Sequence, residues 1–405
     1  NSTVTGGGTF TSANTGTVNY NQGSTGQSVL AGNYGNLVFS GFNKTLASAG
    51  TIGIAGTFTT GTAVGHSVTG STIDFNGGSQ TIPAFSYNNL TMSGTGNKTN
   101  SGTLTIGGNL TNNAGIVFSG TTILNLNGTT HTNGGTLSTA TLFVGSGATL
   151  TNNGTITTST VLSGAGTLTQ GATGILNIGG TAGITTLNAS ATGNTVDYTG
   201  AGQTVTSATY HHLTLSGSGT PILTGVSTIN GNFLLSGTVT PIATTGMAFG
   251  GNLTLSSGTS FDAGSFSHTL KGNWNNAGTF NANASTFTLN GISPQTMSGS
   301  TFNILEINNV AGVSMLSDET IVNTLTLISG AFSIDAHTLT LNGALSIGGG
   351  SLVGGLSSNI VVGGSGASTT LPAITLNNLT LNRASGDSLG GDATINGALT
   401  IANGT

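Results

Sequence analysis

One stretch decides the fold: Gln80-Thr81-Ile82-Pro83-Ala84-Phe85-Ser86-Tyr87-Asn88-Asn89-Leu90-Thr91-Met92-Ser93-Gly94, whose frame returns along the chain. In every full copy a Gln precedes a Leu by ten positions, and these pairs are Gln27 and Leu37, Gln80 and Leu90, Gln203 and Leu213, and Gln295 and Leu305. A fifth copy, at Leu379, has Thr369 in place of the Gln. Self-similarity of this kind is the signature of a repeat protein.

A second motif has the form apolar-x-Gly-x-apolar, where x is any residue, as in Ile229-Asn230-Gly231-Asn232-Phe233. Its glycines are Gly108, Gly231, Gly251, Gly272, Gly343 and Gly397. Gly231, Gly251 and Gly272 are about 20 residues apart, which is the length of one turn of a β-solenoid with three short sides. Each such turn is called a rung below.

The local pattern agrees with that length. Segments such as Thr103-Leu104-Thr105-Ile106 alternate polar and apolar residues, as expected for strands with one buried face. Gly and Asn between them are expected to form corners with positive φ. We therefore predict an all-β fold, an elongated β-solenoid (β-helix) of about 20-residue turns. The alternative, an array of antiparallel β-sandwiches of immunoglobulin type, would need Pro-rich linkers about every hundred residues and an anchoring Trp or Tyr in each domain. The chain has 5 Pro and 1 Trp, which do not supply them.

Composition excludes several classes of protein. Only 3% of the 405 residues are charged, against roughly 25% in ordinary soluble domains. Four Lys and Arg cannot neutralise a run of phosphates, so nucleic acid is excluded as a partner. Cys is absent, which excludes a disulfide scaffold. No stretch approaches the roughly 18 apolar residues of a membrane span.

No charge run or composition shift interrupts the repeats, so residues 1–405 are predicted to form a single continuous solenoid. Gly397 to Thr405 reads as another rung begun, not as a polar cap. An open solenoid end is a template for further strands. The chain is therefore predicted to be a segment or a polymer subunit, whose ends join flanking repeats of the same chain or further copies in a homopolymer.

The pattern from Gly77 to Gly96 resembles repeats in large secreted, adhesin-like surface proteins of Bacteroidota, which are type IX secretion substrates. The resemblance covers most of the chain and implies export, an extracellular position at the cell surface, and a structural or adhesive role. Asp387-Ser388-Leu389 is similar to the O-glycosylation sequence of that phylum, which makes Ser388 a candidate glycosylation site. The sorting domain of such proteins is absent from this sequence.

Residues that could carry chemistry are few. Asp74 and Asp197 occupy equivalent places in two repeats and are not expected to meet. Asp318-Glu319, the only acidic pair, is interpreted as a solvated turn. Asp387 and Asp392 flank a Gly-rich turn and form a weak Ca²⁺ candidate.

The six histidines lack metal-ligand spacing and are interpreted as exposed. His211 and His212 are expected on opposite faces of a strand. We therefore predict no metal site, no cofactor and no enzyme.

Two kinds of residue could form a binding surface. Tyr34, Tyr87 and Tyr210 stand three residues before the repeat Leu and are interpreted as corner residues, with a glycan-binding stripe as the alternative. Flat Thr-x-Thr arrays bind ice in some solenoids, but Thr103-x-Thr105, Thr167-x-Thr169 and Thr338-x-Thr340 recur at irregular separation. That irregularity argues against ice binding.

The sequence thus predicts an extracellular structural filament or stalk of stacked rungs, with head-to-tail polymerisation as one form of it. The repeat positions above are predicted to be structural. A carbohydrate- or surface-binding adhesin is the alternative. A polysaccharide-degrading enzyme, which needs two carboxylates on one face, and an ice-binding protein are weaker alternatives.

Overall fold

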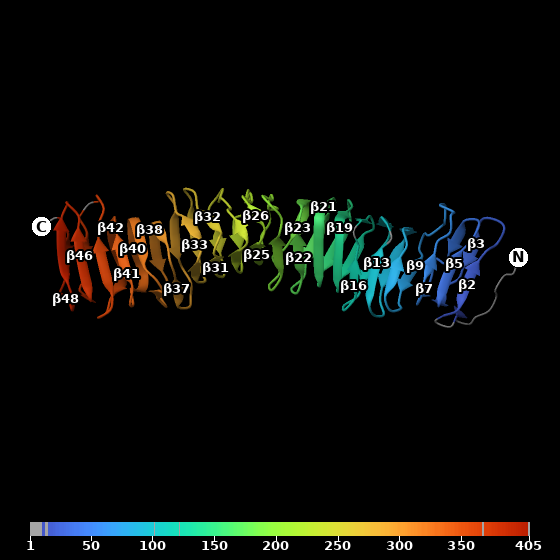
Figure 1. Ribbon diagram of the computed structural model, residues 1–405, viewed down its shortest axis with the longest axis horizontal. Helices are drawn as coiled ribbons and strands as arrows, with labels where there is room; N and C mark the ends of the chain where they lie inside the picture. The colour runs from blue at the N-terminus through green and yellow to red at the C-terminus, as the bar shows by residue number, and fades with distance from the viewer. Residues whose placement is uncertain (1–9, 13–14, 101, 121, 367, 404–405) are drawn as a thin grey trace. The chain divides into compact units, whose positions relative to one another are not determined.

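The computed structural model describes residues 10–12, 15–100, 102–120, 122–366 and 368–403 (Figure 1). Among them there are strands and no helices, and the stacked parallel strands form a β-solenoid with roughly 20 residues per turn, which confirms the predicted fold class. The chain divides into two units, Asn1–Asp197 and Tyr198–Thr405, with β24 (Thr195–Tyr198) at the division. Each unit is described by itself.

Each rung of the first unit has three faces. Along the first face run β1 (Phe10–Thr11), β4 (Gly32–Tyr34), β7 (Thr51–Ile54), β9 (Thr72–Phe75), β12 (Asn89–Met92), β15 (Leu110–Asn112), β18 (Thr130–Asn133), β20 (Thr149–Asn152), the end of β21 (Thr155–Gln170) and β23 (Thr181–Asn188). Along the second run β10 (Gln80–Ile82), β13 (Asn97–Asn100), β16 (Val117–Ser119), β19 (Thr136–Val144), the start of β21 and β22 (Ile175–Ile178). Along the third run β11 (Ser86–Tyr87), β14 (Leu104–Ile106), β17 (Ile123–Leu126), the end of β19, the middle of β21 and β23. Two shorter ladders join β2 (Thr17–Tyr20), β5 (Asn36–Phe39) and β8 (Phe58–Thr59), and β3 (Gln27–Val29) and β6 (Lys44–Leu46).

The second unit repeats the arrangement. One ladder holds β25 (His212–Leu215), β28 (Phe233–Leu235), β31 (Leu253–Leu255), β34 (Trp274–Asn276), β37 (Gln295–Met297), β39 (Val313–Met315) and the end of β40 (Glu319–Ser333). Another holds β27 (Thr228–Ile229), β30 (Ala248–Phe249), β33 (Ser267–Leu270), β36 (Thr286–Leu289), β38 (Thr301–Asn308), β40 and β42 (Ala344–Val353). A third joins β40, β41 (Thr338–Leu341), β43 (Asn359–Val362), β46 (Asn378–Asn382) and β49 (Leu399–Asn403). Short pairs complete it, namely β26 (Ser218–Gly219) with β29 (Thr238–Val239), β32 (Ser260–Asp262) with β35 (Thr279–Asn281), β44 (Thr370–Leu371) with β47 (Ser388–Leu389), and β45 (Ile374–Leu376) with β48 (Ala393–Ile395).

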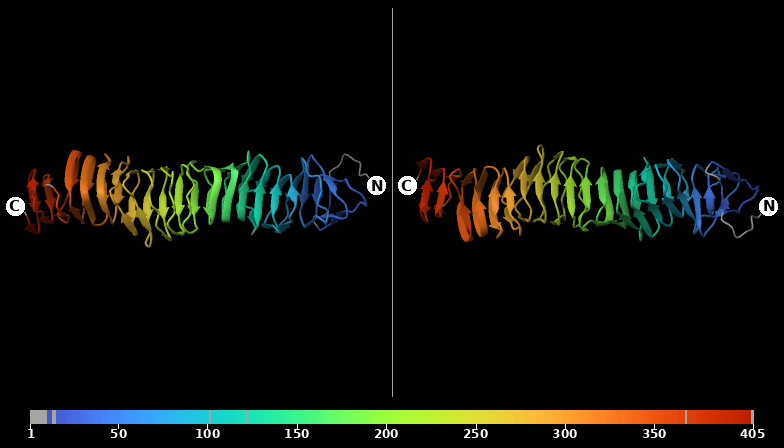
Figure 2. Two further views of the ribbon diagram at one scale, coloured as in Figure 1. Left: turned by 90° about the horizontal axis from the view of Figure 1, so that it is seen from above. Right: turned by 90° about the horizontal axis from the view of Figure 1, so that it is seen from below.

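Figure 2 shows the strands of each unit stacked one behind the next. The core of each unit is the column of inward side chains, since alternate residues of a strand face opposite sides. In β12, Leu90 and Met92 are 1% exposed, whereas Asn89 and Thr91 between them are half-buried. The five repeat leucines, at 37, 90, 213, 305 and 379, are all buried.

The glycines of the second motif are required by close approach between rungs. A Cβ atom on Gly343 would overlap the carbonyl oxygen of Asn323, and one on Gly272 would overlap the backbone of Gly251. At Gly108, Gly231, Gly251 and Gly397 an added Cβ would also be too close to the preceding rung. None of the six has the positive φ expected of corner glycines; that conformation occurs elsewhere, as at Gly94 (φ 72°).

Candidate functional site

The repeat glutamines clamp one rung to the one before it. Gln80 accepts the backbone N–H of Gly77 on Oε1 at 2.9 Å, and its Nε2 donates to the carbonyl oxygens of Ile54 and Gly56, both at 2.8 Å. Gln295 does the same with Gly291 on one side and with Leu270 and Gly272 on the other. Each buried amide thus uses both its oxygen and its nitrogen in hydrogen bonds and links two rungs, as is usual for buried polar groups.

The other two repeat glutamines also accept a backbone N–H from the corner that precedes them. Gln203 is 7% exposed and accepts the N–H of Gly200, and the half-buried Gln27 accepts the N–H of Gln22 at 3.0 Å. The glutamine motif and the glycine motif are in direct contact in this repeat, because Gln295 donates to the carbonyl oxygen of Gly272.

In the fifth copy, Arg383 and Thr369 replace the missing glutamine. The Nη2 atom of Arg383 donates to the carbonyl oxygens of Leu341 and Gly343, at 3.0 and 2.9 Å. These two residues match Leu270 and Gly272 in the motif. Nη1 of Arg383 donates to Thr369 Oγ1 at 2.7 Å, and Thr369 Oγ1 donates to Gly343.

Two lysines are also used inside the first unit. Lys98 is buried one rung beyond Gln80, and its Nζ donates to Gln80 Oε1 and to the carbonyls of Gly77 and Gly78. Lys44 stands in the same relation to Gln27 and donates to the carbonyl of Ser40. Burial lowers the pKa of both lysines. Three of the four cationic side chains are thus buried.

A ladder of amides runs through the interior of the first unit. Asn112 donates to Asn133 at 2.7 Å, Asn133 to Asn152 at 2.8 Å, and Asn152 to Gln170 at 2.9 Å, one rung at a time. All four residues are at most 1% exposed. We call this chain of side chains the amide ladder. The ladder was not predicted, although the triplets Leu-Thr-Asn at 110–112 and 150–152, His-Thr-Asn at 131–133 and Leu-Thr-Gln at 168–170 carry the signal.

The acidic pair Asp318-Glu319 is not a solvated turn, and that prediction was wrong. Glu319 opens β40, is 1% exposed, and accepts the N–H of Ser300 at 2.9 Å. Burial raises its pKa to about 8, and the neighbouring Asp318 adds to the shift. Only Asp318 is exposed, and it accepts the N–H of Thr338.

Two further candidate carboxylates, Asp74 and Asp387, are held by hydrogen bonds and an ion pair. Asp74 lies between Gly53 and Thr91 in register and accepts Ser93 Oγ at 2.7 and 2.8 Å. Burial nevertheless raises the pKa of Asp74. Asp387 pairs with Arg383 at 3.5 Å and accepts the N–H of Thr369, so it does not face a shared Ca²⁺ site with the exposed Asp392.

Ser388 lies on the surface. It is exposed in β47, and its Oγ is 2.8 Å from Thr370 Oγ1 on the neighbouring β44. The hydroxyl is therefore accessible, and its glycosylation stays a prediction.

Two predictions about histidines were wrong. His131 and His268 are fully buried, and each accepts a backbone N–H from the preceding rung on Nδ1, from Leu110 and Met247 respectively. Burial lowers the pKa of both. The rings of His211 and His212 do not lie on opposite faces, because their centroids are 4.1 Å apart in an edge contact.

The repeat tyrosines are corner residues, as interpreted, and the stripe alternative was wrong. Tyr34, Tyr87 and Tyr210 are at most 2% exposed. Each hydroxyl donates to the carbonyl four residues earlier, on Leu30, Pro83 and Thr206.

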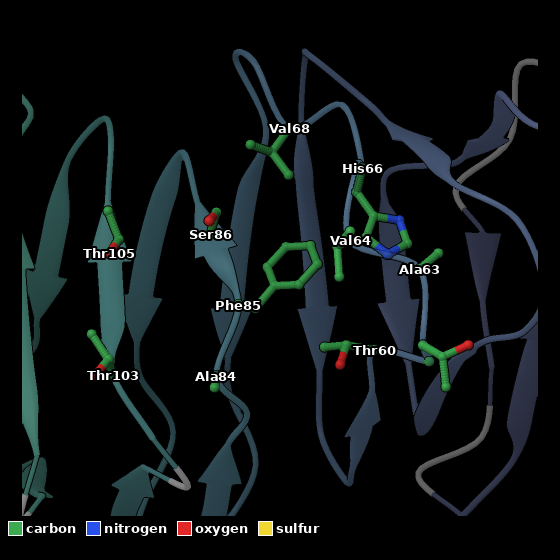
Figure 3. Close-up of a pocket in the computed structure, with 12 residues that line it drawn as sticks. Thr60, Ala63, Val64, His66, Val68, Ala84, Phe85, Ser86, Thr103 and Thr105 are labelled. Carbon is green, nitrogen blue, oxygen red and sulfur yellow. The ribbon is translucent and has the colours of Figure 1, made fainter.

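The most promising binding site is a groove of about 340 Å³ on the first unit (Figure 3). Phe85 and His66 face the same space, with ring centroids 5.5 Å apart, and Phe85 packs on Phe58 behind it at 5.4 Å. Hydroxyls surround the rings, and they belong to Thr60, Thr62, Ser86, Thr103 and Thr105. Burial lowers the pKa of His66, with the Lys44 charge adding to the shift. The loop that holds His66 has no counterpart in the repeat motif, so sequence periodicity gave no signal for the groove.

None of the 12 residues that line this groove is Asp, Glu, Lys or Arg. A neutral surface of hydroxyls around a half-buried ring can stack on a sugar and hydrogen-bond to it. The two carboxylates of a glycosidase are not among the lining residues.

Comparisons with known proteins add no identity: no protein-family model, no curated protein and no solved structure matches the chain. Within the described ranges, no helix could cross a membrane. The same part of the chain holds no group of three His, Asp or Glu side chains placed to bind a metal.

Proposed function

We propose that the chain is an extracellular structural element, a stalk or filament segment at a cell surface, and that it is not an enzyme. The observation that carries the proposal is the use that the chain makes of its few cationic side chains and of its repeat glutamines. Arg383, Lys98 and Gln295 all bond backbone carbonyls of earlier rungs inside the solenoid, and so link the rungs to one another.

A mechanical role fits this use of side chains. Parallel ladders bind every rung to the next, and buried amides and cations add side-chain bonds between rungs. A surface with few charges has few electrostatic interactions that a change in salt concentration or pH could weaken. The resemblance of the repeats to Bacteroidota surface proteins supports the proposed location, and head-to-tail self-association belongs to the same proposal.

Electron microscopy and proteolysis test it together. We expect the purified chain to resist proteinase K in high salt and in low salt, and to form fibres or uniform elongated particles at all concentrations. Gln295→Leu should shorten the digestion half-life, because it removes the bonds to Leu270 and Gly272. Rapid digestion of the unmodified chain, or compact particles, would contradict a structural role.

A second candidate function is carbohydrate binding at the Phe85 groove, which the lining residues favour. A glycan array with neutral and acidic saccharides tests it. We expect binding of neutral saccharides, a large loss of binding in Phe85→Ala, and no change in Phe42→Ala, an exposed aromatic outside the lining. An array without signal, or equal binding by both variants, would exclude the groove as a glycan site.

A further inference from the structure

Threonines form a two-column array on the first face of the first unit. In the first column, Thr130, Thr149, Thr167 and Thr186 are register partners on four consecutive rungs. In the second column, the partners are Thr91, Thr111, Thr132, Thr151 and Thr169, on five consecutive rungs. We call these nine residues the threonine array. β18, β20 and the end of β21 each contribute a complete Thr-x-Thr.

The sequence argued against such an array because the Thr-x-Thr segments are unevenly spaced, and that reasoning was wrong. The rungs differ in length: Thr111 and Thr132 are 21 positions apart, whereas Thr151 and Thr169 are 18 apart. The corners absorb the difference, so the strands stay in register. Thr103-x-Thr105 and Thr338-x-Thr340 lie elsewhere, and Thr105 has Ser86 and Asn125 as partners.

The array stands on the most strongly braced part of the unit. Its second column alternates with the amide ladder: Thr132 and Thr151 point outward immediately before the inward Asn133 and Asn152. Side-chain ladders of this kind hold sheets flat against their natural twist. Thr is also β-branched, so its methyl and hydroxyl have few alternative positions. The array is therefore regular in register, and its side chains are preorganised.

Its chemistry is uniform. Each position presents one methyl group and one hydroxyl that can both donate and accept. The second column is bordered by Asp74, the register partner of Thr91, and by Asn188, the register partner of Thr169. Threonines repeat at about 4.8 Å between strands and about 6.6 Å along each strand. Hydroxyls and methyl groups that repeat in two directions in this way can face a regular solid such as an ice surface. The methyl groups order the water above them, and the hydroxyls hold it in place.

From the register, the amide ladder and this spacing, we infer that the threonine array is an ice-binding surface. A crystalline polysaccharide is the other regular solid that such a face could contact, but its recognition uses aromatic stacking, which the array lacks. The inference does not depend on the proposed structural role, because an ice-binding face can be carried by any rigid scaffold. Nor does it involve the Phe85 groove, whose Thr103 and Thr105 lie on the third face.

The experiment measures thermal hysteresis, ice-crystal shape and partition of the purified chain into a slowly growing ice hemisphere. We expect all three to be positive for the unmodified protein. Thr151→Tyr places a large ring in the middle of the array and should abolish most of the hysteresis. The control is Thr326→Tyr, on an outward, half-buried Thr of β40 in the second unit.

A second variant separates ice contact from folding. Thr149→Val with Thr151→Val keeps β-branching and the methyl groups but removes two hydroxyls, so the fold should survive and hysteresis should fall. Circular dichroism confirms folding of each variant. Exclusion of the unmodified chain from ice would overturn the inference, as would equal activity in Thr151→Tyr and Thr326→Tyr. Binding to cellulose or chitin powder without ice activity would also overturn it and would favour the polysaccharide.

Discussion

Arg383 donates from Nη1 to the hydroxyl of Thr369 at 2.7 Å, and this pair stands where four other repeats have a glutamine. The guanidinium reaches Leu341 and Gly343, the carbonyls that correspond to those bound by Gln295 in its own repeat. Two residues that are 14 positions apart thus supply together the donor that one glutamine supplies elsewhere. The rung geometry is therefore the conserved requirement within this chain, and different side chains can meet it.

Mutation can restore the glutamine of the other repeats at position 369. Arg383→Met removes one of two donors from each of the carbonyls of Leu341 and Gly343, which keep the N–H of Gly363 and the hydroxyl of Thr369 respectively. It should destabilise the second unit by roughly 2–3 kcal/mol, because the charged donor and its hydrogen bonds between rungs are lost. In that background, Thr369→Gln should recover most of the loss. Both are best compared in an Asp387→Asn chain, because Asp387 would otherwise be left buried without its cation. Thermal denaturation measures the recovery, and a double variant no more stable than Arg383→Met alone would show that the two arrangements are not equivalent.

Breaking the amide ladder should also destabilise the solenoid. Asn133→Ala removes the acceptor of Asn112 and the donor to Asn152, and it leaves a cavity, so we expect a loss of roughly 2–4 kcal/mol. Hydrogen exchange should locate the effect in β15, β18 and β20. Asn177→Ala, on an outward half-buried Asn, is the control and should change stability by less than about 0.5 kcal/mol. Equal effects of the two changes would show that the ladder adds nothing.

Glu319 should make stability fall as pH rises. Its folded pKa of about 8 lies above the usual 4.5, so the folded chain binds the proton more tightly than the unfolded chain. The stabilisation is complete below about pH 4.5 and is lost as pH rises through 8, with an upper limit of about 5 kcal/mol. Melting temperatures of the unmodified chain at pH 6 and pH 9 should differ, and those of Glu319→Gln should differ less.

The exposed neighbour provides the control for this titration. Asp318→Asn should retain the fall between pH 6 and pH 9, because burial is the main cause of the shift and Asp318 only adds to it. His131 and His268 act at the other end of the scale: their lowered pKa values remove stability as pH falls below about 6.5. A pH profile of Glu319→Gln identical to that of the unmodified chain would refute the assignment to Glu319.

A charge at a repeat leucine should collapse its rung. Leu213 is fully buried between rungs and pairs in register with Phe233, so Leu213→Asp places an unpaired carboxylate in the core. We expect a fall in melting temperature and loss of protease resistance. The adjacent outward residue gives the matched change, Thr214→Asp, which should be tolerated. Unchanged protease resistance in Leu213→Asp would contradict its place in the core.

The alternation of polar and apolar residues was enough to predict the strands and the inward leucines. The spacing of Gly231, Gly251 and Gly272 was enough to predict a rung of about 20 residues. Burial of Lys98 and Glu319 was not predictable from residue type, since charged side chains are seldom buried without partners. Their partners are backbone groups of neighbouring rungs, which no local pattern identifies.

The threonine array shows a different limit. Sequence spacing records the length of each rung, including its corners, whereas register depends only on the strands. Thr132, Thr151 and Thr169 are aligned in space although their separations in sequence are unequal. The amide ladder was predictable in principle. Asn152, for example, follows Leu150 by two positions and must share its inward face.

The small number of cations has a consequence for how this protein is detected. Trypsin cleaves after Lys and Arg, and the chain offers only Lys44, Lys98, Lys271 and Arg383. Of these, Lys271 alone is exposed. Complete digestion of the unfolded chain would release 99–271 and 272–383 as two very long peptides, poorly suited to routine mass spectrometry. A proteomic survey based on trypsin would therefore under-report this protein even where it is abundant, and a protease with a different specificity, such as elastase, is the better choice.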